Sequence, residues 1–159
     1  MTLELTAEHD RAMREHAERI YPHECCGFLL GDELWRVGAV VPAVNSKGEE
    51  ERHNRFHITP EASMRAEKEA RARGLGVIGH YHSHPDAPAI PSTPKTVSES
   101  NHGIAGGSDL ENATWPGYAF VIVSVKQGAS DELTCWNLSD DRSEFHPIPT
   151  RIVQTQETR

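Results

Sequence analysis

Apolar residues first recur at helical spacing, with Met13, Ala17 and Ile20 on one face. Thr6 before them suits the N-cap of a helix, and Pro22 after them cannot continue one. These signals predict a helix between Thr6 and Pro22 that buries its apolar face against the rest of the protein.

A second helix is predicted from the residues at its two ends. Thr59 suits the N-cap, and Pro60 suits the first helical position. Gly74 then ends the helix after Arg73.

Short apolar runs between glycines and polar residues predict strands. The predicted strands are residues 27–31, 34–41, 55–58, 76–81, 118–125 and 133–138. The first two form a hairpin, and the almost uninterrupted apolar run 118–125 is expected in the middle of its sheet. The chain is therefore predicted to be a single α/β domain, with one mixed sheet of about six strands flanked by helices.

Composition and charge exclude several classes of function. The chain has 159 residues, which suits one domain, and 24 acidic against 16 basic residues give a formal net charge of −8. That charge lacks the basic field of a nucleic-acid binder. We find no apolar run of transmembrane length and no signal-peptide pattern at the N-terminus, so neither nucleic acid nor membrane is expected as a partner.

The cysteines point to a cytoplasmic protein with reduced thiols. Their number is odd, and Cys25 and Cys26 are adjacent while Cys135 stands alone, so they form no disulfide framework. Cys25 and Cys26 should face opposite sides of one strand, where a packed apolar role is favoured over metal ligation.

Histidine is the unusual component, with ten residues. His82 and His84 stand two apart directly after the predicted strand 76–81, so both imidazoles can point the same way in an extended segment. Such a pair supplies half of a four-coordinate zinc site, which a carboxylate and a water would complete. Taken alone, the pair could equally be two histidines that bind no metal and are hydrogen-bonded within the protein or exposed to solvent.

The residues around this pair resemble the JAMM (MPN+) metalloprotease family. The matching segments are Tyr81-His82-Ser83-His84-Pro85, Pro91-Ser92, Asp109, Trp115-Pro116-Gly117-Tyr118 and, upstream, residues 22–31. Residues 56–60 and 136–139 also resemble its small bacterial members, so the resemblance spans about 3–143. It implies the family's fold, with helices and sheet layered as in cytidine deaminases. A zinc nucleobase deaminase itself is disfavoured, because its PCxxC segment is missing.

The resemblance assigns a role to each matching residue. Glu24 matches the general acid/base, which takes a proton from zinc-bound water and passes it to the leaving amine. His82 and His84 match two ligands of Zn²⁺, and Ser92 matches the serine that hydrogen-bonds the developing oxyanion. The implied substrate is a ubiquitin-like sulfur-carrier protein, cleaved after its C-terminal Gly-Gly in pathways that include cysteine biosynthesis. A second copy of the chain is a further candidate partner.

The third zinc ligand departs from the family pattern. An aspartate normally follows the serine by three residues, but this chain has Lys95 there, and an ammonium ion cannot ligate zinc. We expect Asp109 as the third ligand, after an insertion at about 93–108. Other residues that could replace it are Asp86, Glu99 and His102. If none of them ligates, the alternative is a metal-free scaffold or binding domain without hydrolase activity.

The insertion and the end of the chain complete the predicted organisation. Residues 103–107 within the insertion form a glycine-rich turn, or else mimic the Gly-Gly tail of a ubiquitin-like protein. Residues 1–143 are predicted to form the JAMM domain, and 144–159 a polar C-terminal tail.

Overall fold

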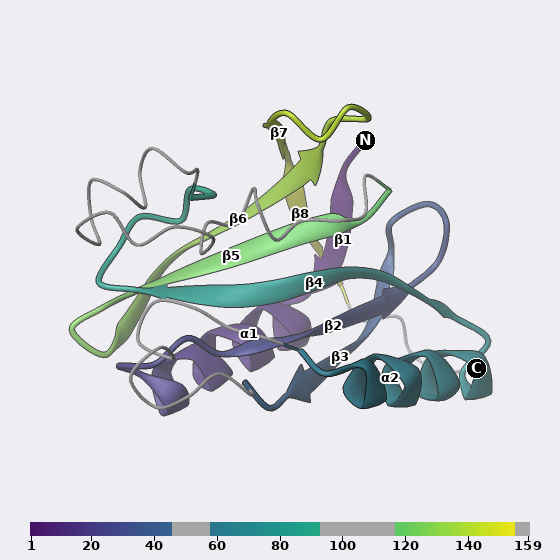
Figure 1. The fold of residues 1–159 in the computed structure, drawn as a ribbon, viewed down its shortest axis with the longest axis horizontal. Helices are drawn as coiled ribbons and strands as arrows, with labels where there is room; N and C mark the ends of the chain where they lie inside the picture. Colours follow the sequence, from purple (N-terminus) through teal and green to yellow (C-terminus); the bar gives the residue numbers. More distant parts are fainter. Residues whose placement is uncertain (46–57, 93–116, 155–159) are drawn as a thin grey trace.

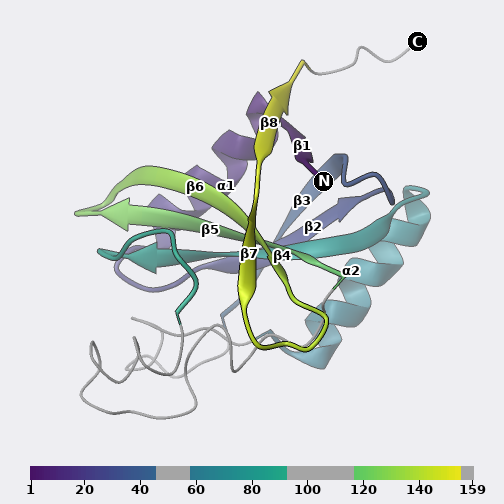
Figure 2. The ribbon, with the colours of Figure 1, turned by 90° about the horizontal axis from the view of Figure 1, so that it is seen from above.

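The computed structural model shows a twisted sheet with one helix on each face (Figures 1 and 2). It describes residues 1–45, 58–92 and 117–154. The elements in chain order are β1 (Leu3–Thr6), α1 (Ala7–Ile20), β2 (Cys26–Gly31), β3 (Val37–Ala43), α2 (Pro60–Ala72), β4 (Gly76–Pro85), β5 (Ala119–Lys126), β6 (Ala129–Leu138), β7 (Phe145–Ile148) and β8 (Thr150–Val153). The predicted α/β class is therefore confirmed.

Six strands form the main sheet, in the order β3-β2-β4-β5-β6-β7. β4 and β5 run parallel, and the other neighbours run antiparallel, so the sheet is mixed as predicted. β5 lies between β4 and β6 and is almost fully buried, in agreement with its continuous apolar sequence. β1 and β8 form a separate parallel pair.

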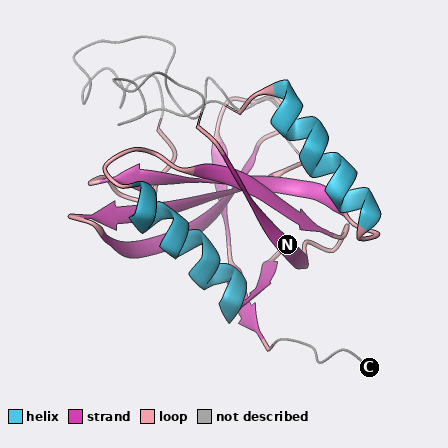
Figure 3. Cartoon of the chain, turned by 90° about the horizontal axis from the view of Figure 1, so that it is seen from below, coloured by secondary structure: helices cyan, strands magenta, loops and turns pink. Residues whose placement is uncertain are grey.

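The two faces of the sheet carry separate cores because side chains alternate along each strand. On one face Met13 and Ala17 of α1 pack with Tyr81 and Val121. On the other, the Ala66 and Ala70 side chains of α2 pack with Phe28 and Leu30 of β2 in a second core. Figure 3 shows the two helices apart on either side of the strands.

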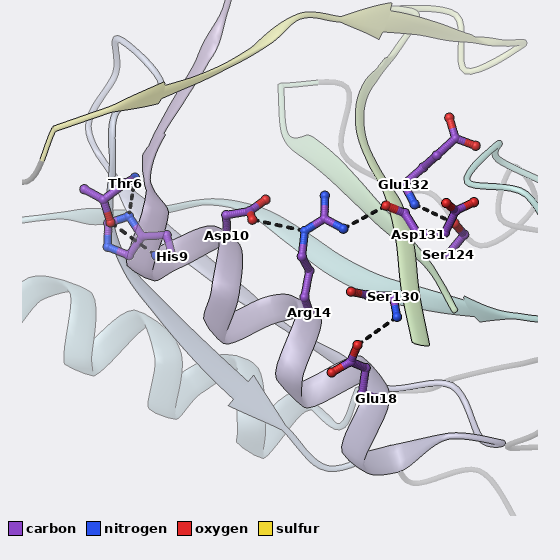
Figure 4. A network of polar contacts seen from close by, with 9 residues as sticks. All are labelled: Thr6, His9, Asp10, Arg14, Glu18, Ser124, Ser130, Asp131 and Glu132. Carbon is purple, nitrogen blue, oxygen red and sulfur yellow. Dashed lines mark hydrogen bonds and ion pairs between the residues drawn. The ribbon is translucent and has the colours of Figure 1, made fainter. Parts of the chain in front are cut away.

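Polar contacts tie α1 to the rest of the protein. Thr6 caps the helix as predicted, accepting the N–H of His9 while the His9 ring accepts the N–H of Thr6. Arg14 pairs with Asp10 and donates to the carbonyl of Asp131 at 2.8 Å in β6 (Figure 4). These bonds hold α1 against β6, and they thereby fix the position at which the segment after α1 begins.

Two parts of the structure differ from the sequence expectation. The strand predicted to end at residue 81 continues to Pro85, because β5 pairs with it up to Pro85. Residues 145–153, expected in a polar tail, form β7 and β8. Their backbone groups pair with β6 and β1, and the local sequence gives no signal for this pairing. Within the described ranges, no helix is both long enough and apolar enough to span a membrane.

Candidate active site

The pairing of β2 with β4 brings the predicted catalytic segments together. Cys26 lies opposite His82 in this antiparallel pair. One residue further on, the Ser83 N–H donates to the Cys25 carbonyl at 3.2 Å, and the Cys25 N–H donates to Ser83 Oγ at 2.8 Å. Continued by one more residue beyond β2, the same register would place Glu24 opposite His84.

The three histidines of β4 face the α2 side of the sheet. The His80 ring contacts Phe28 and Phe120, whereas Tyr81, the next residue, belongs to the core beneath α1. Alternation then places His82 and His84 on the same face as His80. The prediction that both imidazoles point one way is thus supported, although they lie within β4 and not beyond its end.

The imidazoles of His82 and His84 converge through their Nε2 atoms, which lie 3.1 Å apart. Both side chains are buried, with 4% and 8% of their surfaces exposed. His84 Nδ1 lies 2.8 Å from the Pro88 carbonyl, and because a carbonyl only accepts, Nδ1 carries the proton. In its neutral form His84 then presents the lone pair of Nε2 toward His82, the tautomer found in metal-ligating histidines that donate to a backbone carbonyl.

This arrangement fits two of the four positions around a zinc ion. Two nitrogens at about 2.0–2.1 Å from a tetrahedral ion lie roughly 3.3–3.4 Å apart, close to the observed separation. Among the residues that the structure describes, no group of three His, Cys, Asp or Glu side chains could hold a metal. The predicted third ligand, Asp109, and its competitors Glu99 and His102 lie outside the described residues.

Glu24, two residues before β2, is buried, with 5% of its surface exposed. Asn45, which follows β3, donates from Nδ2 to the Glu24 carbonyl at 3.0 Å. With Cys25 held by Ser83, the main chain of Glu24 is thus fixed from two neighbouring strands. A carboxylate on a fixed backbone in a water-poor site can serve as a proton acceptor.

Ser92 ends a described segment that runs back over the sheet from β4. The Thr134 hydroxyl of β6 donates to the Ala89 carbonyl at 2.7 Å and accepts the indole N–H of Trp136 at 2.8 Å. His84 holds the same segment through Pro88. Ser92 itself is half-buried, and its role as oxyanion donor stays a prediction.

The environment favours packed roles for Cys26 and His80. Burial raises the pKa of Cys26 to about 12, so its thiol is protonated at neutral pH. Burial, and then the charge of His82, lower the pKa of His80 to about 4, which keeps this ring neutral among its aromatic neighbours. The finding for Cys26 agrees with the packed role expected for it.

Asp86, a competing ligand in the sequence, uses its carboxylate elsewhere. Its Oδ2 accepts the Tyr21 hydroxyl at 2.6 Å, and its Oδ1 accepts the Gln127 N–H at 2.8 Å. Sequence reasoning missed this contact, as it missed Ser83, Asn45 and Thr134. Their partners are distant in sequence, and a single Ser, Thr or Asn has no local pattern that predicts its contacts. For Ser83 the one available signal was its place between two histidines at the end of an apolar strand.

Comparison with known proteins reveals several similarities. A family model described as prokaryotic homologs of the JAB domain matches residues 6–139. Desampylase from Haloferax volcanii is 31% identical over 111 residues, which cover 70% of this chain and 69% of that protein. The solution structure of a protein from Salinibacter ruber is 40% identical, has a TM-score of 0.67, and covers 96% of this chain and 92% of its own. The crystal structure of a JAB1/MPN domain protein from Archaeoglobus fulgidus shares the fold at 18% identity, with a TM-score of 0.52 and coverage of 94% of this chain and 98% of its own.

Proposed function

Because the chain belongs to the JAMM/MPN family, we propose that it is a zinc-dependent hydrolase of ubiquitin-like protein conjugates. The convergence of the His82 and His84 Nε2 atoms, across the strand pair from buried Glu24, carries this proposal. The similarity to Desampylase supports a hydrolase acting on conjugates of a ubiquitin-like protein. Our more specific proposal is cleavage of a peptide or isopeptide bond after the C-terminal Gly-Gly of a sulfur-carrier protein.

Each proposed residue has one task in this reaction. His82 and His84, with Asp109 as the third ligand, would hold a zinc ion, which when bound acidifies water and polarises the scissile carbonyl. Glu24 takes a proton from the attacking water and delivers it to the leaving amine. Ser92 donates a hydrogen bond to the carbonyl oxygen as negative charge develops there. His84 is oriented for its task by the Pro88 carbonyl.

Metal content and hydrolysis, measured on the same variants, test this assignment. The substrate is a ubiquitin-like sulfur-carrier protein whose Gly-Gly terminus is extended by a fluorescently labelled peptide. We expect about one zinc per chain in the wild type and in Glu24→Gln, and its loss in Asp109→Ala, with hydrolysis abolished in both variants. Glu33→Gln, an exposed carboxylate change at the β2–β3 turn, is the matched control and should keep both properties.

The same experiment decides between this function and a metal-free scaffold, which the replacement of the usual aspartate by Lys95 favours. A wild type that binds no zinc and cleaves nothing would establish the scaffold. If Asp109→Ala retains zinc, a residue other than Asp109 is the third ligand. Equal cleavage of a carrier ending in Ala-Ala would contradict the proposed Gly-Gly specificity.

A further inference from the structure

Three segments far apart in the sequence meet beside the candidate site. Tyr21 follows α1 and precedes Glu24 by three residues, while Asp86 follows β4 and comes two residues after His84. Gln127 lies in the turn between β5 and β6. We name the contact of Tyr21, Asp86 and Gln127 the Asp86 clamp.

Asp86 bonds to both of the other segments and to β5. Its carboxylate accepts the Tyr21 hydroxyl and the Gln127 N–H, and its own N–H donates to the Val125 carbonyl at 2.6 Å. The hydrogen bond to Asp86 is the main cause that raises the pKa of Tyr21. Hydrogen bonds to a charged carboxylate are about twice as strong as neutral ones.

The backbone around the clamp is itself restricted. Asp86 has φ 54° and Gln127 has φ 50°, values in the left-handed region that non-glycine residues adopt at a cost. Both residues hold this conformation where they bond to each other. Aspartate tolerates it better than most side chains, which suits Asp86 to the point where β4 ends.

These contacts connect the proton-transfer segment to the ligand segment. Tyr21 lies three residues before Glu24, and Asp86 lies two residues after His84, so a bond between Tyr21 and Asp86 fixes one segment against the other. Displacement of a reacting group by about 1 Å can cost about a hundredfold in rate. Loss of the clamp is therefore expected to lower the rate of hydrolysis more than it lowers the stability of the fold.

We propose that Asp86 is a positioning residue, which holds the Glu24 segment against the His84 segment through Tyr21 and Gln127. This inference rests on the proposed hydrolase function. It differs from ligation, because Asp86 acts through the two segments without contacting the metal. It also differs from a purely structural bond, because the rate of hydrolysis should respond before the folded state does.

Four variants test the clamp by steady-state kinetics on the extended carrier protein, with zinc content and thermal unfolding measured alongside. Asp86→Ala should lower kcat about tenfold with KM changed less than about twofold. Asp86→Asn should restore most of this rate, because its side-chain oxygen can accept the Gln127 N–H and its amide can donate to the Tyr21 oxygen. Tyr21→Phe should lower kcat less than Asp86→Ala does, and should add nothing in the Asp86→Ala background.

Asp32→Ala is the matched control. Asp32 is another surface aspartate that accepts two backbone N–H groups, those of Leu34 and Arg36, but it lies at the opposite end of β2 from Glu24. Its replacement should leave kcat unchanged. A similar loss of kcat in Asp32→Ala would mean that general destabilisation, and not positioning, lowers the rate, and would overturn the proposal.

Amide hydrogen exchange separates this proposal from the proposed function. Exchange of the Cys25 amide, which Ser83 Oγ protects, should be faster in Asp86→Ala but not in Asp86→Asn or Asp32→Ala. If the wild type hydrolyses nothing, the function fails, and the exchange result alone decides the clamp. Unchanged Cys25 exchange, zinc lost from Asp86→Ala, or a lowered unfolding temperature with unchanged kcat would each overturn it.

Discussion

At the scale of single residues, Ser83 shows how one short side chain serves two strands. It stands between the two proposed ligands but points to the opposite face, where it is completely buried. Its hydroxyl oxygen accepts a hydrogen bond from the N–H of Cys25, the residue just before β2. The strand pairing is thereby prolonged toward Glu24, so the serine orders the segment that carries the proposed acid/base residue.

Replacement of Ser83 should therefore reduce stability and hydrolysis together. Ser83→Ala leaves the buried Cys25 N–H without an acceptor, which we expect to lower the free energy of unfolding by about 1–3 kcal/mol. Ser83→Thr keeps the hydroxyl and should recover most of this loss. Urea denaturation of both variants measures the difference; equal stability of the alanine and threonine variants would contradict the role of the hydroxyl.

The residues of the site were predictable to different degrees for physical reasons. His82 and His84 could be found because their spacing of two matches the alternation of a strand. Glu24 and Ser92 have no such local signal and were proposed only through the family resemblance. Asn45 could not be found, because its bond to Glu24 depends on how β3 ends beside β2.

At the scale of elements, the close approach of β2 and β4 depends on Gly27. Tyr81 lies opposite Gly27, and its ring covers the place where a Cβ at that position would stand. The Tyr81 hydroxyl in turn lies 2.7 Å from His16 Nδ1 in α1. A glycine in β2 thus admits the ring that connects the sheet to α1 on the face behind the candidate site.

A methyl group at this glycine should disturb both the packing and the site. Gly27→Ala must displace the fully buried Tyr81 ring, which we expect to cost about 1–3 kcal/mol of stability and to reduce hydrolysis. Gly76→Ala is the matched control, since a Cβ at this β4 glycine meets no atom within 4 Å. Thermal unfolding measures both changes, and equal unfolding temperatures for the two variants would contradict this account.

Elements with strong local patterns were predicted, whereas those formed by long-range pairing were not. α1 and α2 have caps and stop signals, and β5 is a continuous apolar run. β7 and β8 are four residues each, β7 contains Pro147, and Pro149 separates the two, so only their pairing with β6 and β1 makes them strands. The same reason explains β4, whose last residues are polar but paired on β5.

At the scale of the whole molecule, the first and last strands of the described chain, β1 and β8, pair with each other. Arg151 of β8 forms an ion pair with Glu4 of β1, and this contact joins residues from opposite ends of the sequence. Figure 2 shows β8 beside β1 on the side of the molecule that carries α1. The predicted boundary at 143 therefore cuts off β7, the last strand of the main sheet, and β8, the partner of β1, so residues 145–153 belong to the folded structure.

A buried histidine in α1 makes the stability of this folded structure depend on pH. Burial, and then the charge of Arg19, lower the pKa of His16 to about 4 from its ordinary value of 6.5. Between these two values the unfolded chain binds the proton and the folded chain does not, so stability falls as the pH decreases from 6.5 toward 4. Above pH 6.5 His16 contributes no pH dependence, because it is neutral in both states.

We therefore expect the unfolding temperature to fall by several degrees between pH 7 and pH 5, and less steeply in His16→Asn. Asparagine can still accept the Tyr81 hydroxyl but does not titrate, so it removes the proton uptake and keeps the hydrogen bond. His80, whose pKa is also lowered to about 4, maintains part of the slope in this variant. Differential scanning calorimetry at both pH values measures the effect. If His16→Asn is as sensitive to acid as the wild type, the proton uptake must occur at other groups.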